Sequence, residues 1–496
     1  MISIPRRSVR LMLFALFALS CVTVVFLAVT YLGWHLKDQR IQLLMLWSIL
    51  VGVVLLWSQR RRFAHMPFAI AAILFAGLVM RFGYALYTPA TLRFHDLAPI
   101  DVNATGHAGY VLHLYLYGAL PASNAFQYAT PPLYYMLSAF FMRIYALGSG
   151  LSNTVELFEA ARLPSLFASC GALLLAWQIG KEVKLSRSGM IVLLTLCAFL
   201  PNHYLLAGRT NPDGLAVFFV FLVTLYALRW QRTSSTGNTI MLALGFGFGM
   251  MTKMTVAVMA LPVGIMMVIM IWRRCVRHGE WQFLKQIGLF ALIAFPLGLW
   301  FPLRNAMLYG QPLGFVYDMG IDHPQFIGDV PLWQRFGLPS LRALVTPLYV
   351  DWQSSANALI YTLKSSVFGE FSYEIDPMIP YLLLLANTFL VLLSLAATGA
   401  VTWKALRERS GNWLLLCGIW LAILVSYLLF NLRYPFHCSM DYRYMVGTSL
   451  IGALMLAKAE SMLGDGTLLR KVLVSSAGFA LTTFAAASIA MYTHIV

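Results

Sequence analysis

Two acids and two histidines stand close together in a short polar stretch that follows a long apolar run. They are His95, Asp96, Asp101 and His107. Acids at a membrane surface are costly unless they are solvated, paired or used, and a carboxylate beside apolar groups readily accepts a proton from a hydroxyl. Asp101 and Asp96 are therefore candidate general bases, and His95 and His107 are candidates to orient the acid or bind an acceptor. The alternative is a solvated loop in which Asp101 caps the helix expected after it.

A second polar turn, from Arg209 to Asp213, separates two apolar runs. Asp213 either caps the next helix, with Pro212 in its first turn, or is a second acid that faces the first polar stretch, with Arg209 near an anionic ligand; the two roles are compatible. Lys253 stands alone in an apolar hairpin, where a lysine is costly. A phosphate is its natural partner. The structural alternative is a side chain that extends to the membrane interface.

Two later polar groups add more cations. Arg304 and Asn305 stand where an apolar run ends, with Tyr309 close behind, and Asp441 and Arg443 lie in a short segment before another run. Guanidinium groups match the oxygens of a phosphate, so Arg443 is a candidate phosphate ligand. The alternative is an aromatic belt at the membrane interface that contains an ion pair. The candidate acids and cations together suit a substrate with a lipid tail and a charged head.

The composition is that of a polytopic membrane protein. The chain has 496 residues, of which 60% are hydrophobic and 11% are charged, whereas soluble domains carry about 25% charged residues. The net charge of +16 lies largely in short loops between apolar runs, as expected for loops on the cytoplasmic side, and this distribution argues against nucleic-acid binding. The six cysteines show neither metal-ligand spacing nor a disulfide framework.

The apolar runs predict an all-α fold with about 13 transmembrane helices. Only helices or closed barrels cross a bilayer, and these runs are too long and too uniformly apolar for barrel strands. The predicted spans are about 11–33, 41–57, 67–88, 163–180, 188–206, 213–229, 239–252, 254–272, 287–303, 378–402, 412–431, 444–459 and 471–493.

Basic residues cluster in alternate loops, which places those loops and the N-terminus in the cytoplasm. The opposite side then carries two long outer loops with juxtamembrane helices, one of them at about 131–146. All the candidate site residues fall on this outer side. The predicted parts are two N-terminal spans as an extension (1–66), a catalytic membrane core (67–310) that includes the first outer loop (89–162), a second outer loop (304–377), and C-terminal spans (378–496).

The order of several short motifs resembles the GT-C superfamily of integral membrane glycosyltransferases, in the branch of protein O-mannosyltransferases and lipid A aminoarabinose transferases. The matching motifs are Asp96 and Asp101 followed by Gly106-His107 and Tyr110, then Gly118-Ala-Leu-Pro121, Pro131-Pro-Leu-Tyr-Tyr135, Ala161-Arg162-Leu-Pro-Ser165, Asn211-Pro-Asp213, Gly247-Phe-Gly-Met-Met-Thr-Lys253, and Arg304-Asn305 with Tyr309-Gly310. Each motif alone is weak, but their order and topology together are moderately specific. Beyond about residue 315 the resemblance is limited to Asp441-Tyr-Arg443.

The resemblance implies an inverting transfer of a sugar from a polyprenyl phosphate to a hydroxyl. An acid of the first outer loop deprotonates the acceptor, Asp213 is a second acid, and cations stabilise the departing lipid phosphate. The implied phosphate contacts are Lys253, Arg304 and Arg443. Many relatives carry an Asp-Glu pair in the first loop, whereas here no Glu follows either Asp. We favour Asp101 over Asp96 because it lies closer to Gly106-His107 and Tyr110.

The predicted partners are a polyprenyl-phosphate-linked sugar donor, a glycan, lipid or protein acceptor, and the bilayer. The predicted location is the inner membrane of a bacterium, with the site on the external face. A transporter or lipid flippase is the alternative function, and a ligase or polymerase with lipid-diphosphate donors is a third. A divalent metal on His95, Asp96, Asp101 and His107 is not favoured, because their spacing fits no known site, and no other cofactor is predicted.

Overall fold

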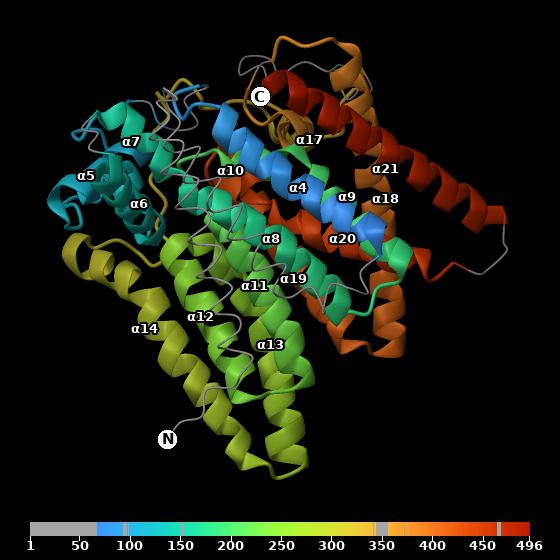
Figure 1. The fold of residues 1–496 in the computed structure, drawn as a ribbon. Helices are drawn as coiled ribbons and strands as arrows, with labels where there is room; N and C mark the ends of the chain where they lie inside the picture. The colour runs from blue at the N-terminus through green and yellow to red at the C-terminus, as the bar shows by residue number, and fades with distance from the viewer. Residues whose placement is uncertain are drawn as a thin grey trace, which may run out of the picture.

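The computed structural model describes residues 67–496, apart from 93–96, 98, 150–152, 341, 344–355, 372 and 464–467. The predicted N-terminal extension (1–66), with its two spans, lies outside the described residues, as do His95 and Asp96. Within the described residues all regular elements are helices, and a single isolated bridge pairs Phe326 with Phe436. Figure 1 shows these helices as one bundle with shorter helices at one end. The predicted all-α fold is confirmed.

Eight helical stretches of the described chain are long and apolar enough to cross a membrane, or nine if a bent pair counts as one span. The predicted count of 13 is not confirmed: two of those spans lie outside the described residues, and two more, α12 and α20, are shorter helices of 17 and 14 residues. The long stretches are Phe68–Ala85, Thr154–Glu182, Asp213–Arg232, Met254–Arg277, Trp281–Tyr309, Met378–Glu408, Gly411–Arg433 and Arg470–Ile495. This is a multi-pass membrane protein.

The bundle is built around α8 and α11, which are mostly buried, and helices with largely exposed apolar surfaces surround them. Such exposed apolar faces suit contact with lipid. The helices of the bundle are α4 (Phe68–Tyr87), α7 (Thr154–Ala161), α8 (Leu163–Glu182), α9 (Arg187–Phe199), α10 (Pro201–Ala207), α11 (Asp213–Arg232), α12 (Thr236–Thr252), α13 (Ala260–Ile271), α14 (Leu284–Tyr309), α18 (Met378–Glu408), α19 (Gly411–Arg433), α20 (Gly447–Glu460) and α21 (Leu468–Ile495).

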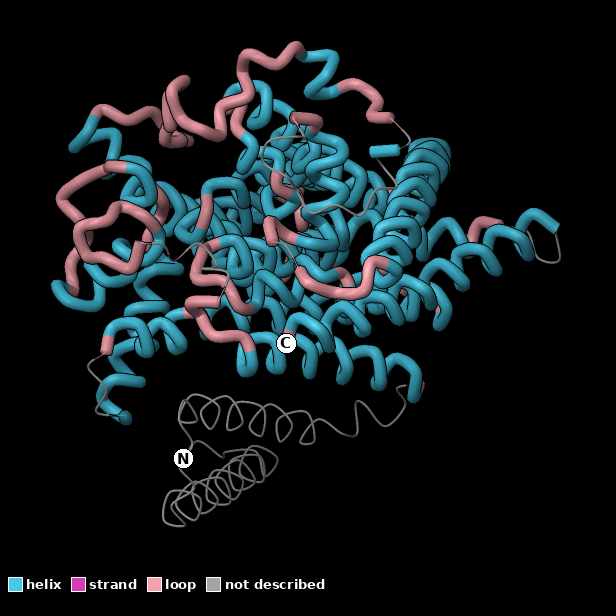
Figure 2. The backbone as a smooth tube through the Cα atoms, turned by 90° about the horizontal axis from the view of Figure 1, so that it is seen from above, coloured by secondary structure: helices cyan, strands magenta, loops and turns pink. Residues whose placement is uncertain are grey.

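Shorter helices occupy the connections. They are α5 (His107–Tyr117), η1 (Phe126–Ala129), α6 (Leu133–Ser149), η2 (Met254–Met259), η3 (Trp272–Arg277), η4 (Trp281–Phe283), α15 (Leu332–Phe336), α17 (Ala358–Phe368), η5 (His437–Met440) and η6 (Tyr442–Tyr444). Figure 1 places α5, α6, α7 and α17 at the same end of the bundle, and Figure 2 shows the long loops, in pink, running between such short helices. Both long loops therefore contain helices of their own, as predicted.

A bend interrupts the predicted span 188–206. It separates α9 from α10 by 48° at Leu200 and Pro201. Proline has no backbone N–H and cannot continue the hydrogen bonds of the preceding helix. Arg81 of α4 satisfies the carbonyl groups left at the end of α9, because its guanidinium donates to Cys197 O at 2.8 Å and to Ala198 O at 3.3 Å. The bend leads α10 directly into the turn that carries Arg209 and Asp213.

A second break occurs at Lys253, where the sequence predicts the tip of a hairpin. Helix α12 ends at Thr252, Lys253 is extended (φ −159°, ψ 130°), and η2 starts at Met254. The Lys253 amide still donates to Gly249 O at 2.9 Å, which closes the last turn of α12. The lysine side chain therefore projects from the junction of two helices and not from the middle of one.

Contacts between distant segments join the two long loops with the segment between α19 and α20. Arg304 at the end of α14 donates to Pro121 O at 3.4 Å, and the rings of Phe126 and Tyr317 are 5.7 Å apart. The amide of Ile327 donates to Pro435 O at 2.8 Å. Residues separated by more than a hundred positions in the chain thus meet at one end of the bundle.

Candidate active site

An ion pair between Asp213 and Lys253 lies at the centre of this end of the bundle. Asp213 is the first residue of α11, and its side chain is 6% exposed, while that of Lys253 is 19% exposed. Arg443 approaches the same carboxylate, with its Nε 3.8 Å from Asp213 Oδ2. Three segments that are remote in sequence therefore bring two cations to one acid, away from bulk water.

The charged cluster continues beyond Asp213. A guanidinium nitrogen of Arg443 lies 3.8 Å from Glu370 Oε2, Arg209 lies 3.7 Å from the same oxygen, and Asp441 Oδ2 lies 3.5 Å from Arg443 Nε. The cluster contains three acids (Asp213, Glu370 and Asp441) and three cations (Arg209, Lys253 and Arg443), so its formal charges cancel. Buried charges are tolerated when they are paired in this way.

The local backbone explains why these side chains point together. Asn211 Oδ1 accepts a hydrogen bond from the Asp213 amide at 3.1 Å, and the N-cap of α11 is Pro212. The expected role of Asp213 as the cap is therefore wrong, and its carboxylate is left to pair with Lys253. In the other segment, Asp441 Oδ1 accepts from the Arg443 amide at 3.0 Å, which fixes the direction of Arg443.

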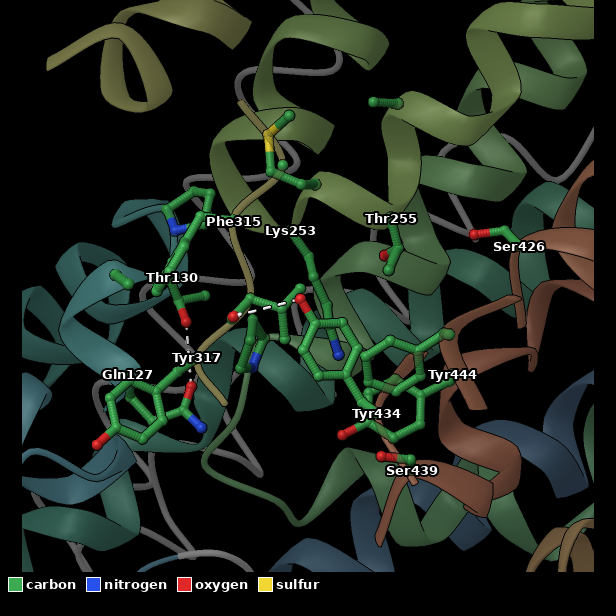
Figure 3. Close-up of a pocket in the computed structure, with 18 of the residues that line it drawn as sticks. Gln127, Thr130, Lys253, Thr255, Phe315, Tyr317, Ser426, Tyr434, Ser439 and Tyr444 are labelled. Carbon is green, nitrogen blue, oxygen red and sulfur yellow. Dashed lines mark hydrogen bonds between the residues drawn. The ribbon is translucent and has the colours of Figure 1, made fainter. Parts of the chain in front are cut away.

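An aromatic ring supports the two cations. Lys253 Nζ lies 4.5 Å from the centre of the Tyr444 ring, and the Arg443 guanidinium lies 5.3 Å from it. Burial raises the pKa of Tyr444 above its ordinary value, so that the phenol is neutral and its ring face attracts cations. Figure 3 shows the Lys253 side chain extending toward the rings of Tyr434 and Tyr444.

A cavity of about 720 Å³ opens over this cluster. Five of the residues predicted from the sequence line it, namely His107, Asp213, Lys253, Asn305 and Arg443. One part of the wall is apolar and comes from η2 and α19, with Met254, Val258, Ile423 and Phe430. Another part comes from the first outer loop and from the segment after α14. The cavity therefore combines cations with both an apolar and a polar wall.

Other predicted residues lie behind the cavity wall. Arg209 and Asp441 belong to the charged cluster but do not line the cavity. Arg304 donates to Asn305 Oδ1 at 2.9 Å, and Tyr309 lies 5.8 Å from the Arg304 guanidinium. In this arrangement Arg304 holds Asn305 against the first outer loop.

The first outer loop contributes His107 to the cavity wall. Asp101 is exposed, does not line the cavity, and accepts hydrogen bonds from the amide and the side chain of Asn103 at 2.9 and 3.2 Å. The alternative in which Asp101 caps the helix after it is wrong, because the N-cap of α5 is Gly106. In the described part of the chain, no three His, Cys, Asp or Glu side chains gather as a metal site.

His107 is held by Tyr135, the last residue of the Pro-Pro-Leu-Tyr-Tyr motif. Its Nδ1 lies 2.8 Å from the Tyr135 hydroxyl. Burial raises the pKa of Tyr135 well above its ordinary value, so the hydroxyl is protonated and can donate to Nδ1. The hydrogen bond fixes the orientation of the imidazole ring, whichever of the two groups donates.

Several residues of the site were not assigned from the sequence. Glu370, in the second outer loop, contacts Arg209 and Arg443, and no motif in the sequence indicates this link. Other cavity residues have common side chains in loops and short 3-10 helices, namely Gln127, Thr130, Gln311, Tyr434, Ser439 and Tyr444. Nothing in their spacing marks them, and only their position in the three converging segments could have suggested a role.

Residues 129–300 match the family described as dolichyl-phosphate-mannose-protein mannosyltransferase. The matched region contains the Pro-Pro-Leu-Tyr-Tyr motif, Asp213 and Lys253. It covers less than half of the chain. No curated protein matches the chain.

Among solved structures, the protein is similar to the Archaeoglobus fulgidus oligosaccharyltransferase AglB in complex with an inhibitory peptide and a dolichol-phosphate (12% identity, 86% of this chain and 56% of that chain, TM-score 0.49). It is also similar to ArnT from Cupriavidus metallidurans bound to undecaprenyl phosphate (14% identity, 86% and 74%, TM-score 0.45). The chain spans 55% of the length of the apo oligosaccharyltransferase that it also matches. The match of residues 129–300 agrees with the resemblance predicted from the sequence, to the mannosyltransferase branch of integral membrane glycosyltransferases.

Proposed function

We propose that the protein is a glycosyltransferase that moves a sugar from a polyprenyl phosphate to an acceptor hydroxyl, at the outer face of a bacterial inner membrane. The observation that carries this proposal is the pair of cations, Lys253 and Arg443, on the wall of a cavity that also has an apolar side. A lipid-linked phosphate needs both features. The family matched by residues 129–300 is described by a polyprenyl-type donor, which supports the same class of substrate.

The phosphate would lie at Lys253 and Arg443. Both cations are paired with Asp213 in the structure, so phosphate oxygens would share or take over these contacts. Charge-assisted hydrogen bonds from ammonium and guanidinium groups to phosphate are strong. The same groups stabilise the negative charge that grows on the phosphate as the sugar leaves it.

The lipid tail would follow the apolar wall of the cavity. This wall is formed by η2 and α19, and helix α13 continues from η2 with exposed apolar residues such as Leu261 and Ile265. Exposed leucine and isoleucine side chains on a membrane helix suit contact with hydrocarbon. A prenyl chain could therefore extend from the cavity into the bilayer without burying a polar group.

The reaction would be a single displacement. A carboxylate takes the proton of the acceptor hydroxyl, the oxygen forms a bond to the anomeric carbon, and the bond from that carbon to the phosphate oxygen breaks with its electron pair on the phosphate. Attack from the face opposite the phosphate inverts the anomeric centre. The candidate bases are Asp101 and Asp96 from the sequence, and Asp213, which contacts the two cations proposed for the phosphate, is a second acid on the side of the leaving group.

Transfer of labelled sugar from purified polyprenyl-phosphate donors to acceptors, with the full chain in lipid nanodiscs, tests the proposal. Asp96→Asn, Asp101→Asn and Asp213→Asn are compared, with the exposed Asp329→Asn as the matched control. We expect at least one of the three to lose activity by about a hundredfold or more and the control to retain it. Full activity in all three variants would remove the proposed chemistry, and no transfer from any lipid-linked donor would remove the function.

A further inference from the structure

The end of the bundle opposite the cavity carries a hairpin tip that is rich in cations. Helix α13 continues through η3 to this tip, and α14 runs from it back to the cavity wall (Figure 1). Between Trp272 and Lys285 the sequence has four cations but a single acid, Glu280. The tip therefore has a net positive charge, which the proposed chemistry at the other end of the bundle does not use. The four cations are Arg273, Arg274, Arg277 and Lys285.

Three of the four cations have no acid to balance them. Arg274 lies 3.9 Å from Glu280 Oε2. No ion pair joins the other three cations to an acid among the residues that the structure describes. Elsewhere at this end of the bundle, Arg229 and Arg232 are instead paired with Glu182, at 3.4 and 2.6 Å. An accessible group of unbalanced cations attracts anionic partners.

Exposed apolar side chains lie among the cations. Trp272 and Trp281 are both exposed, and the Arg277 guanidinium lies 3.9 Å from the centre of the Trp272 ring. Val276 and Leu284 are exposed as well. Tryptophan is enriched where the hydrocarbon of a membrane meets the lipid headgroups. The tip thus offers a partner both apolar groups and positive charge.

Hydrogen bonds hold the tip in a compact turn. The Glu280 amide donates to Arg274 O at 2.9 Å, and the Gly279 amide donates to Cys275 O at 3.1 Å. Gly279 has a φ of 71°, which glycine adopts without strain. The helical turns η3 and η4 pack against each other across this reversal. The cations before and after the turn therefore share one small surface.

The place of the tip along the helices indicates what covers it. The stretches Met254–Arg277 and Trp281–Tyr309 are both long and apolar enough to cross a membrane, and the tip joins their ends. Its cations therefore lie at the level of the lipid headgroups, on the side that the loop charges predict to be cytoplasmic. A soluble acidic partner would match the charge but not the exposed tryptophans.

We propose that the tip of the α13–α14 hairpin binds the headgroups of anionic phospholipids in the leaflet opposite the cavity. Arg273, Arg277 and Lys285 would donate to the phosphate oxygens, while Trp272 and Trp281 would lie between the headgroups and the hydrocarbon. Hydrogen bonds from guanidinium and ammonium groups to phosphate are strong. Each such cation near an anionic membrane surface strengthens binding by about fivefold.

Native mass spectrometry of the full chain in detergent, titrated with phosphatidylglycerol or phosphatidylcholine, tests this proposal. We expect phosphatidylglycerol to bind more tightly, and the difference to shrink as the salt concentration rises. The combined variant Arg273→Gln, Arg277→Gln and Lys285→Gln should weaken binding of phosphatidylglycerol by about tenfold or more and leave phosphatidylcholine unchanged. Equal binding of the two lipids to the unaltered chain would overturn the proposal.

A matched control removes the same number of cations from another loop at this end of the bundle, between α8 and α9. It combines Lys181→Gln, Lys184→Gln and Arg187→Gln, all at exposed positions. Residues 177–190 are all described and include no exposed tryptophan, so we expect little change in the binding of phosphatidylglycerol. Equal losses in the two combined variants would overturn the proposal, because binding would then follow only the net charge of this end.

Glu280→Gln guards against a folding defect, since it should increase binding. The Glu280 side chain is exposed, and its removal leaves Arg274 free to contact a lipid. We expect phosphatidylglycerol to bind several fold more tightly to this variant. Unchanged or weaker binding would overturn the proposal. Displacement of the lipid by inorganic phosphate at constant ionic strength would also overturn it, because the cations would then belong to a site for a soluble anion.

Discussion

Lys253 is stabilised by a carboxylate on one side and an aromatic ring on the other, and each contact has a different consequence. The face of the Tyr444 ring attracts the ammonium group whether or not a ligand is bound. Asp213 neutralises it only while the two remain in contact. A ligand phosphate can therefore replace the acid without removing the support of the ring. The ammonium group thus has two partners in an environment that is largely shielded from water.

Asp213→Asn should show how strongly the lysine depends on its acid. Removal of one partner from a buried ion pair costs about 3–5 kcal/mol because the other charge stays buried. We expect a lower midpoint of thermal unfolding in detergent and a large loss of sugar transfer. Glu408→Gln makes the same change in the exposed pair with Lys404, whose nitrogen and oxygen are 3.7 Å apart, and should leave both measurements unchanged. An unaltered midpoint in Asp213→Asn would contradict the importance of the pair.

Cys438 offers a chemical probe of the cavity, which it lines. Burial raises the pKa of its thiol to about 11, and the nearby Arg443 limits the rise. Since the thiolate is the reactive form and a free thiol has a pKa of about 8.5, maleimide labelling of Cys438 at pH 8 should be about a hundredfold slower than that of a free thiol. The rate should increase as the pH rises toward 11.

The labelled site is identified by mass spectrometry, with Cys438→Ser as the control for the other cysteines. Undecaprenyl phosphate should slow the labelling further if it occupies the cavity. Fast labelling of Cys438 at pH 8 would contradict the raised pKa and would show that the thiol is more exposed to water than in the structure.

Among the elements, the bend between α9 and α10 has a defined support. The Arg81 guanidinium makes five hydrogen bonds, to Gly77 O, Ser169 O and Oγ, Cys197 O and Ala198 O. These bonds join α4 and α8 to the end of α9. Without Arg81, the buried carbonyl groups of Cys197 and Ala198 at the bend would lack these hydrogen-bond donors. Because α10 leads into the turn before Asp213, the bend also determines where that acid lies.

Arg81→Met should therefore destabilise the bundle. Each buried acceptor left without a partner costs about 1–3 kcal/mol, so we expect a clearly lower unfolding midpoint and a lower yield of folded protein. Arg81→Lys should recover only part of the loss, because one ammonium cannot reach all the acceptors. Arg407→Met, at an exposed arginine on α18, is the matched control. Equal stability of Arg81→Met and Arg407→Met would argue against this support.

Most of the helices could be predicted because a bilayer requires long apolar runs. The break at Lys253 was also predicted, since a lysine rarely stands in the middle of an apolar helix. The bend at Pro201 was missed, although the proline was its signal, because the run 188–206 is apolar on both sides of it. The alternative roles of Asp101 and Asp213 as helix caps were wrong, because Gly106 and Pro212 take those positions. Residue type alone does not reveal where a helix begins.

For the whole molecule, the sequence predicted which loops carry charged groups but not how the side chains pair. Glu370 contacts Arg209 and Arg443 from a segment more than 160 positions away from Arg209, and no local pattern indicates such a contact. Pairing across a bundle is a property of packing, which apolar periodicity does not specify.

The balance of the charged cluster should govern how tightly it holds the lipid phosphate. Arg443→Gln removes a cation and should weaken binding of undecaprenyl phosphate, whereas Glu370→Gln removes an acid and should strengthen it by several fold at low salt. Titration in nanodiscs at two salt concentrations measures both effects. The exposed Glu408→Gln is again the control. A change in the same direction for both variants would show that Glu370 acts through the position of Arg443 and not through its charge.

The backbone pairing of residues 325–327 with 435–437 has a mechanical consequence. The amides of Ile327 and His437 donate to Pro435 O and Gln325 O, at 2.8 and 2.9 Å. These hydrogen bonds join the segment that follows α14, which begins near Gln311, to the segment that leads to Arg443. A shift of either segment should therefore move the other, so the part of the cavity wall at Gln311 and the cation Arg443 should change position together.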